Sequence, residues 1–129
     1  VNFGQRKAKK NKLNNLEFRH GDIETPPLQK NSVDVALLSQ ALHHARNPQN
    51  ALSATHKILR PGGKIIIIDL LEHNFAQAKS LYGDRWMGFP KNSLHNWLEK
   101  AGFKNVEIVN VAREEEPPHF ETILATGLK

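Results

Sequence analysis

Cysteine is absent from the 129 residues of the chain. This absence excludes disulfide bonds and metal sites built on thiolates, and it favours a cytoplasmic protein. No apolar run approaches the roughly 20 residues that a membrane-spanning helix needs. The first residues are basic and do not resemble a secretory signal. We therefore expect no association with a membrane.

Acidic residues are absent from the beginning of the chain. The formal net charge is +5, and the remaining 13 basic residues balance the 13 acidic ones once an early basic run is set aside. That run consists of Arg6, Lys7, Lys9, Lys10 and Lys12. A basic run can bind nucleic acid, but only Phe3 places an aromatic ring among these charges. We predict no nucleic-acid partner, and we interpret residues 1–13 as the basic last turns of a helix.

Long apolar stretches are few, and two of them frame the centre of the chain. Residues 33–38 (VDVALL) and 64–69 (KIIIID) are apolar at consecutive positions, and a helical pattern and the stop Arg60-Pro61-Gly62-Gly63 separate them. This pattern predicts a parallel β-α-β unit whose two strands are buried on both faces. Ligands bind beyond the carboxyl ends of the strands in such α/β sheets. The residues after Leu38 and Ile68 are therefore the first candidates for a site.

The other predicted elements are shorter. Residues 16–20 alternate between apolar and polar side chains, which is typical of a strand. Helical spacing predicts helices over residues 75–81 and 91–101, with Gly102 ending the second. Residues 106–111 and 119–126 are two further strands joined by a short turn, so the chain should end in an antiparallel hairpin.

The order of these motifs carries a family resemblance. Gly21-Asp22, a strand, Leu-Arg-Pro-Gly-Gly at residues 59–63, a second strand and Ala-Gly-Phe at residues 101–103 follow one another. This series resembles class I S-adenosylmethionine-dependent methyltransferases, in particular the methyltransferase type 11 branch close to quinone biosynthesis. The resemblance covers residues 16–129. It implies an α/β, Rossmann-like sheet, of which the chain carries the third to seventh strands, with the seventh between the fifth and the sixth.

Two motifs of that family are missing. Its glycine-rich loop, G-x-G-x-G, and the acidic residue that ends its second strand have no counterpart in the 129 residues. We therefore expect a single partial methyltransferase domain over residues 1–129. Residues 1–13 would be the remnant of a helix, and residues 16–129 the core.

The resemblance assigns cofactor-binding roles to four residues. Asp22 would accept a hydrogen bond from the adenine amino group of S-adenosyl-L-methionine, and Ile23 would pack on the ring. Ser39 and Gln40 would lie beside the amino acid portion of the cofactor. An alternative for Asp22 is that Gly-Asp simply turns the chain, as these residues often do.

Candidate substrate-binding residues follow the two central strands and a later loop: His43, His44, Asp69, Arg85 and Trp86. A histidine here could be a general base, because imidazole titrates near neutrality, or it could only pack. Adjacent histidines seldom chelate one ion well, so we predict no metal site. Residues 82–90 could grip a small substrate or merely cover the edge of the sheet.

Two functions remain open. In the first, the intact protein transfers a methyl group to a small-molecule acceptor, and the isolated chain is inactive. In the second, the chain is a non-catalytic association module that pairs through the open edge of residues 33–38. The partner at that edge would be a second copy, forming a homodimer, or a missing amino-terminal segment.

Overall fold

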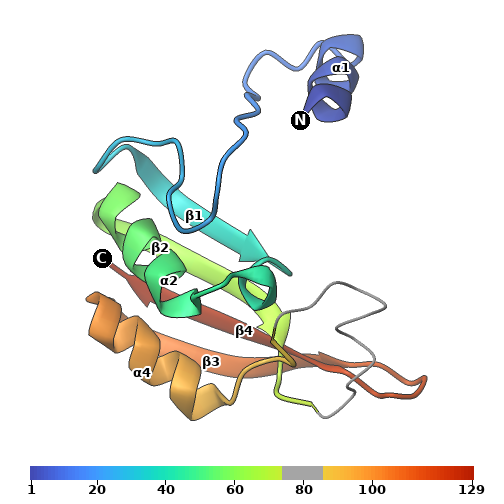
Figure 1. Cartoon of the computed structure of the whole chain (residues 1–129), viewed down its shortest axis with the longest axis vertical. Helices are drawn as coiled ribbons and strands as arrows, with labels where there is room; N and C mark the ends of the chain where they lie inside the picture. Colours follow the sequence, from blue (N-terminus) through green and yellow to red (C-terminus); the bar gives the residue numbers. More distant parts are fainter. Residues whose placement is uncertain (74–85) are drawn as a thin grey trace.

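The computed structural model describes residues 1–73 and 86–129, which form a sheet with helices packed on one of its faces (Figure 1). The elements follow one another along the chain in this order: α1 (Asn2–Lys10), β1 (Val33–Ser39), η1 (Leu42–His44), α2 (Pro48–Ile58), β2 (Leu59–Leu70), α4 (Lys91–Ala101), β3 (Lys104–Arg113) and β4 (Glu121–Leu128). No helix within these residues is long and apolar enough to cross a membrane.

The strand order in the sheet is β1-β2-β4-β3. β1 and β2 run parallel, whereas β4 is antiparallel to both of its neighbours, β2 and β3. The predicted α/β fold and terminal hairpin are therefore confirmed, with the last strand between the second and third strands of the sheet as the resemblance implied. Because β4 is antiparallel to β2, its first residues lie beside the carboxyl end of β2, where Leu70 pairs with Thr122.

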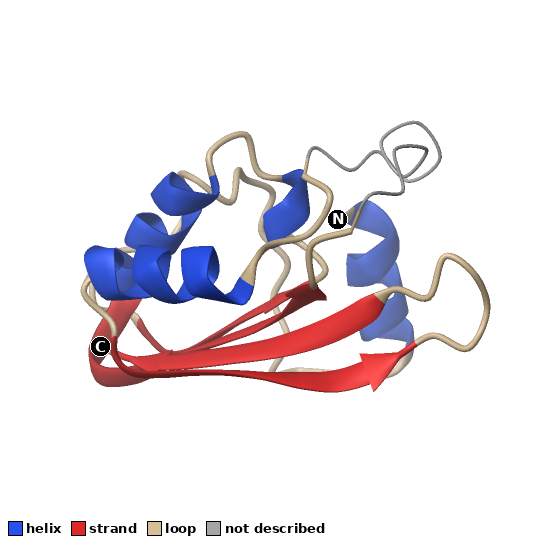
Figure 2. Cartoon of the chain, turned by 90° about the horizontal axis from the view of Figure 1, so that it is seen from below, coloured by secondary structure: helices blue, strands red, loops and turns tan. Residues whose placement is uncertain are grey.

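The core lies between the sheet and two helices. α2 and α4 lie on the same side of the sheet (Figure 2), and their buried leucines pack against alternate residues of β2 and β4. Fully buried members of this core include Leu52, Leu94, Leu98, Ile65, Ile67 and Ile123. Each such side chain contributes about 1.5–3 kcal/mol relative to an exposed one. The helix α2 begins where Asn47 Oδ1 accepts a hydrogen bond from the Asn50 N–H, next to Pro48.

On the opposite face of the sheet the side chains of β1 are exposed, and the prediction that both central strands are buried on both faces is wrong for β1. Val35 is 57% and Leu37 60% exposed. Neither α2 nor α4 covers this face, and Figure 1 shows α1 apart from the sheet, beyond a long connecting stretch. β1 is also an edge strand, as predicted, so one side of its backbone has no strand partner among the described residues.

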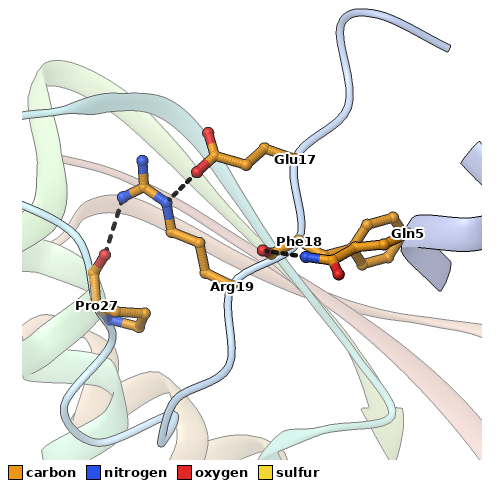
Figure 3. A network of polar contacts seen from close by, with 5 residues as sticks. All are labelled: Gln5, Glu17, Phe18, Arg19 and Pro27. Carbon is orange, nitrogen blue, oxygen red and sulfur yellow. Dashed lines mark hydrogen bonds and ion pairs between the residues drawn. The ribbon is translucent and has the colours of Figure 1, made fainter. Parts of the chain in front are cut away.

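The strand predicted at residues 16–20 does not form. A strand needs a neighbour for its backbone hydrogen bonds, and no described strand lies next to this stretch. Side chains hold it instead (Figure 3). Gln5 Nε2 donates to the Phe18 carbonyl over 3.5 Å, and Arg19 donates to Glu17 Oε1 over 2.8 Å and to the Pro27 carbonyl over 3.0 Å.

The other predicted helices and strands, and the predicted stop at residues 60–63, have different outcomes. The helix at residues 91–101 is confirmed at both ends, and the last two strands are confirmed with shifted bounds. The predicted stop at residues 60–63 is an irregularity inside β2, because Leu59 already pairs with Val33 before the register shifts. The helix predicted at residues 75–81 lies outside the described residues.

Gly102 ends α4 and lies against the ring of His56. Gly102 adopts the left-handed conformation, with φ of +108°, and a Cβ there would lie 2.9 Å from His56 Nε2. The His56 ring also meets the edge of Phe103, with 4.9 Å between ring centroids. Burial lowers the pKa of His56 below 6.5 and the charge of Lys129 acts in the same direction, whereas a hydrogen bond with the Gly102 backbone opposes them.

We predict that Gly102→Ala lowers the free energy of unfolding by about 1–2 kcal/mol, since a side chain disfavours left-handed backbone and would also crowd His56. The matched control is Gly62→Ala. Gly62 has φ of +82°, but nothing lies within 4 Å of its Cβ position, so this variant should lose less. Urea unfolding of the chain measures both. Equal stability of Gly102→Ala and the wild type would contradict the prediction.

A second prediction concerns pH. Because the pKa of His56 is lower in the folded state, the unfolded state binds more protons as the pH falls below 6.5. Stability from this group is therefore complete above pH 6.5 and is lost as the pH falls toward the lowered pKa. His56→Phe keeps a ring beside Phe103 and should flatten this dependence, and Lys129→Met should flatten it partly. Urea unfolding at several pH values tests this, and an unchanged slope in His56→Phe would refute it.

Candidate functional site

The carboxyl ends of β1 and β2 meet at one edge of the sheet. The Gln40 N–H donates to the Ile68 carbonyl over 2.7 Å, so the chain leaving β1 stays attached to the end of β2. Gln40 has φ of +51°, a left-handed conformation that is uncommon for a residue other than glycine. The chain therefore turns sharply after Ser39 and leads directly into η1.

A buried contact between His43 of η1 and Asp69 of β2 joins these two elements. Asp69 has no exposed surface, and His43 is 4% exposed. Asp69 Oδ1 accepts hydrogen bonds from His43 Nδ1 at 2.6 Å and from the Leu70 N–H at 2.8 Å, and Oδ2 accepts from the His43 N–H at 3.2 Å. The carboxylate therefore contacts both the ring and the backbone of His43 and ties η1 to the end of β2.

A pocket of about 270 Å³ opens beside this pair. Its walls come from η1, the end of β2, the end of the hairpin turn and the start of β4. The lining residues are Gln40, His43, His44, Leu70, Glu114, Phe120 and Thr122. Asp69 is not on this wall. The sequence predicted that Asp69 would line the substrate pocket; in this pocket it lies behind His43, and its contact with a substrate stays a prediction.

The two adjacent histidines have different surroundings. Their ring centroids are 4.1 Å apart with the planes at 47°, and His43 is buried whereas His44 is exposed. In the described ranges 1–73 and 86–129, no three histidine, aspartate or glutamate side chains are grouped as metal ligands.

Trp86 also binds the backbone at η1, through two hydrogen bonds. Its indole Nε1 donates to the Ala45 carbonyl and its backbone N–H to the His43 carbonyl, both over 3.0 Å. The Trp86 ring also lies 6.2 Å from the Trp97 ring, and both line a second pocket of about 480 Å³ together with His73. Trp86 therefore supports η1 and borders a pocket, whereas Arg85 lies outside the described residues.

The predicted cofactor residues are not all gathered in one pocket. Asp22 is exposed, and its Oδ1 accepts a hydrogen bond from the Glu24 N–H at 2.8 Å, so it does turn the chain. Ile23 is half-buried against the core. Glu24 ties this loop to the start of α2 through Asn47 and Asn50, at 3.3 Å each. Ser39 is exposed and, like Asp22 and Ile23, is not on the wall of the His43 pocket.

Sequence reasoning missed the far wall of the His43 pocket, formed by Leu70, Glu114, Phe120 and Thr122. A signal for it was present. The terminal hairpin was predicted, and an antiparallel last strand next to β2 necessarily starts at the carboxyl end of β2. Residues at the beginning of that strand therefore belonged among the candidates.

The chain is similar to known methyltransferases in sequence. Residues 1–67 match the profile of a family described as "Methyltransferase domain". The 2-methyl-6-phytyl-1,4-hydroquinone methyltransferase 2 of Oryza sativa subsp. japonica is 26% identical over 108 residues, which cover 83% of this chain and 31% of that protein. The chain spans about a third of the length of the curated relatives it matches.

Solved structures share the fold. A SAM-dependent methyltransferase from Thermotoga maritima superposes with a TM-score of 0.73 at 21% identity, over 97% of this chain and 70% of the other. Phospholethanolamine N-methyltransferase 2 of Haemonchus contortus, in complex with phosphomonomethylethanolamine and S-adenosylhomocysteine, gives 0.78 at 14% identity, over 96% and 39%. Since the family profile matches more than half of the chain and the sheet has the same architecture, the chain belongs to the class I S-adenosylmethionine-dependent methyltransferases.

Proposed function

We propose that this chain carries part of the active site of a methyltransferase that transfers the methyl group of S-adenosyl-L-methionine to a small-molecule acceptor. The observation that supports this most is the pocket at the carboxyl ends of the two parallel strands, with His43 on its wall and Asp69 bound to His43 from behind. Ligands of α/β sheets bind at this edge. Methyl transfer depends mainly on aligning the acceptor with the methyl group.

The residues present fit one end of the cofactor. Asp22 Oδ2 makes no hydrogen bond within residues 1–73 and 86–129, so the exposed carboxylate fits the adenine amino donor, and the half-buried Ile23 beside it fits the adenine ring. The turn at Ser39 and Gln40 would face the amino acid portion. The 129 residues contain no glycine-rich loop and no acidic residue for the ribose. We therefore propose that the isolated chain is inactive and that a longer form supplies these parts.

On the acceptor side, we propose that His43, His44 and Trp86 contact the substrate. Asp69 would hold His43 in place through their hydrogen bond. A contact from Arg85 stays a prediction. So do the cytoplasmic location and the absence of nucleic-acid and membrane partners. The acceptor would be small, because the pocket beside His43 is only about 270 Å³ in volume.

We predict that the 129-residue chain binds S-adenosyl-L-methionine far more weakly than a longer natural form that includes a glycine-rich loop. The methionine and ribose groups would lack partners on the isolated chain, and each polar group left unsatisfied costs about 1–3 kcal/mol. Calorimetric titration of both forms measures the difference. Micromolar binding by the isolated chain would contradict the prediction.

The control uses the longer form. Asp22→Ala should weaken cofactor binding more than His43→Ala does, because the adenine contact depends on the Asp22 carboxylate. Asp34→Ala removes another exposed carboxylate, which pairs with Arg60 at 3.0 Å, and should leave the affinity unchanged. Equal losses in Asp22→Ala and Asp34→Ala would show that the role of Asp22 is wrongly assigned.

A second candidate function is association without catalysis. The observation that favours it is the exposure of Val35 and Leu37 on an edge strand. Apolar edge strands readily pair with another chain, because they combine apolar side chains with backbone groups that lack a strand partner. Two copies could pair their β1 strands and so continue the sheet across a twofold axis. The other occupant of this edge would be an amino-terminal segment of a longer form.

We predict that the 129-residue chain self-associates and that Leu37→Lys returns it to the 14.6 kDa monomer, since a charge at the edge opposes pairing. Val109→Lys is the matched control, because Val109 is 49% exposed but lies on β3, at the other edge of the sheet. Light scattering measures the mass of all three proteins. A monomeric wild-type chain, or an equal effect of the two lysines, would refute pairing through β1.

A further inference from the structure

We propose that the pocket of about 480 Å³ beside Trp86 and Trp97 binds a small organic cation whose ammonium group carries methyl groups. The faces of the two tryptophan rings bind the cation, and the carboxylate of Glu72 balances its charge. The inference concerns binding at this pocket alone, and it does not depend on the proposed transfer of a methyl group.

Two stretches of backbone pair to build this pocket. The Phe89 N–H donates to the Leu70 carbonyl over 3.0 Å, and the Glu72 N–H donates to the Phe89 carbonyl over 3.2 Å. Gly88 allows this close approach, because it has φ of +74° and a Cβ there would clash with the carbonyl of Leu71. The chain that leaves β2 therefore runs beside the residues that precede α4, and Glu72 reaches the wall that the tryptophans line.

The tryptophan rings are held in place before any ligand binds. Phe89 is fully buried, and its ring centroid lies 6.1 Å from that of Trp86 and 5.7 Å from that of Trp97. The hydrogen bond from the Trp86 indole to the Ala45 carbonyl fixes the orientation of this ring. A ligand therefore loses little binding free energy to the ordering of the pocket.

The two tryptophan rings form a corner of the pocket. Their planes meet at 74°, and their centroids are 6.2 Å apart. A cation is attracted to an aromatic face within about 6 Å of the ring centroid, and tryptophan is the best of the aromatic side chains in this contact. An ammonium group in the corner can therefore lie within that range of both rings. Trp86 is 38% exposed and Trp97 is partly exposed, so a ligand can reach them.

The charges on the pocket wall favour a cation. Of the described residues that line it, only Glu72 carries a formal charge at neutral pH, and His73 is the other titratable group. The start of α4 places backbone N–H groups and Lys91 next to Pro90, and these disfavour a cation there. Their influence falls off within the first turn of the helix, and Trp97 lies in the second turn. The ammonium group therefore lies between the rings and not at the helix start.

The scarcity of hydrogen-bond acceptors selects a methylated ammonium group. A primary ammonium has three N–H donors, and each needs an acceptor. The side-chain acceptors on the wall are few, chiefly the Glu72 carboxylate and the Ser93 hydroxyl, and Met87 adds apolar surface beside the tryptophans. A quaternary ammonium has no N–H to satisfy, and its methyl groups bury apolar surface against the wall.

The first experiment uses the fluorescence of Trp86 and Trp97, which are the two tryptophans of the 129-residue chain. The chain is titrated with tetramethylammonium chloride at about pH 8, where histidine is neutral, and at constant ionic strength. The matched probes are tert-butanol, which is similar in size but neutral, and ammonium chloride, which has the charge without the methyl groups. We expect a saturable change at millimolar tetramethylammonium and affinities about fivefold lower, or less, for the other two probes. Equal affinity for either matched probe, or no saturable change, would overturn the proposal.

The second experiment tests the carboxylate. Glu72→Gln should weaken tetramethylammonium binding about twofold to threefold, because an exposed charge contributes modestly. Glu107→Gln is the matched control, since Glu107 is also exposed but lies on β3, away from the pocket wall. This variant should bind as the wild type does. Equal affinities of the two variants would overturn the role of Glu72.

Two replacements of Trp97 test the ring itself, and Trp86 remains as the fluorescent reporter. Trp97→Phe keeps an aromatic face that attracts cations less strongly, whereas Trp97→Leu keeps only apolar surface. Affinity for tetramethylammonium should fall from the wild type to Trp97→Phe and further to Trp97→Leu. Equal affinity of the three proteins would overturn the proposal. If neither variant folds, the comparison of the three probes on the wild type decides it.

Discussion

The carboxylate of Asp69 is the group on which the geometry of the site depends. It accepts three N–H groups at the end of β2, two of them from His43, and it has no contact with solvent. Removing one partner of a buried pair typically costs about 3–5 kcal/mol, a large share of the 5–15 kcal/mol by which a domain is stable. Together with the hydrogen bonds from Trp86 to the carbonyls of His43 and Ala45, the Asp69 carboxylate fixes where the chain goes after β1.

The strand order explains why two separate parts of the chain line the pocket beside His43. The parallel pair β1 and β2 brings Gln40 and Leu70 to one edge, and the antiparallel β4 returns Phe120 and Thr122 to the same place. Among the described residues, α2 and α4 cover a single face of the sheet, and β1 has no strand partner on its outer edge. The chain spans about a third of the length of its curated relatives. It nevertheless contains a folded core and residues that line a pocket, and its strand β1 exposes apolar side chains.

Much of the fold could be predicted from local patterns. The apolar runs at β1 and β2 and the Gly102 end of α4 each have a local physical cause, and each was found. The strand at residues 16–20 was predicted wrongly because alternation describes a side-chain pattern and says nothing about whether a neighbouring strand exists. Burial of β1 on both faces failed for a related reason, since an apolar run does not show what covers it.

The site was harder to predict than the fold. His43 and Asp69 were both chosen from their positions after strands, but their mutual hydrogen bonds depend on η1 folding back over β2, which no local pattern encodes. The roles of Asp22, Ile23, Ser39 and Gln40 came from family resemblance alone. The structure ties the Asp22 loop to α2 through Glu24 and leaves those roles as proposals.

We propose that the cofactor binds along the carboxyl edge of the sheet, with its methyl group directed at the His43 pocket. A crystal structure of a longer natural form with S-adenosylhomocysteine tests it most directly. We expect adenine against Asp22 and Ile23, and the sulfur beside Gln40 at the mouth of the pocket that His43 lines. A ligand bound on the open face of the sheet, or with its sulfur turned away from His43, would contradict it.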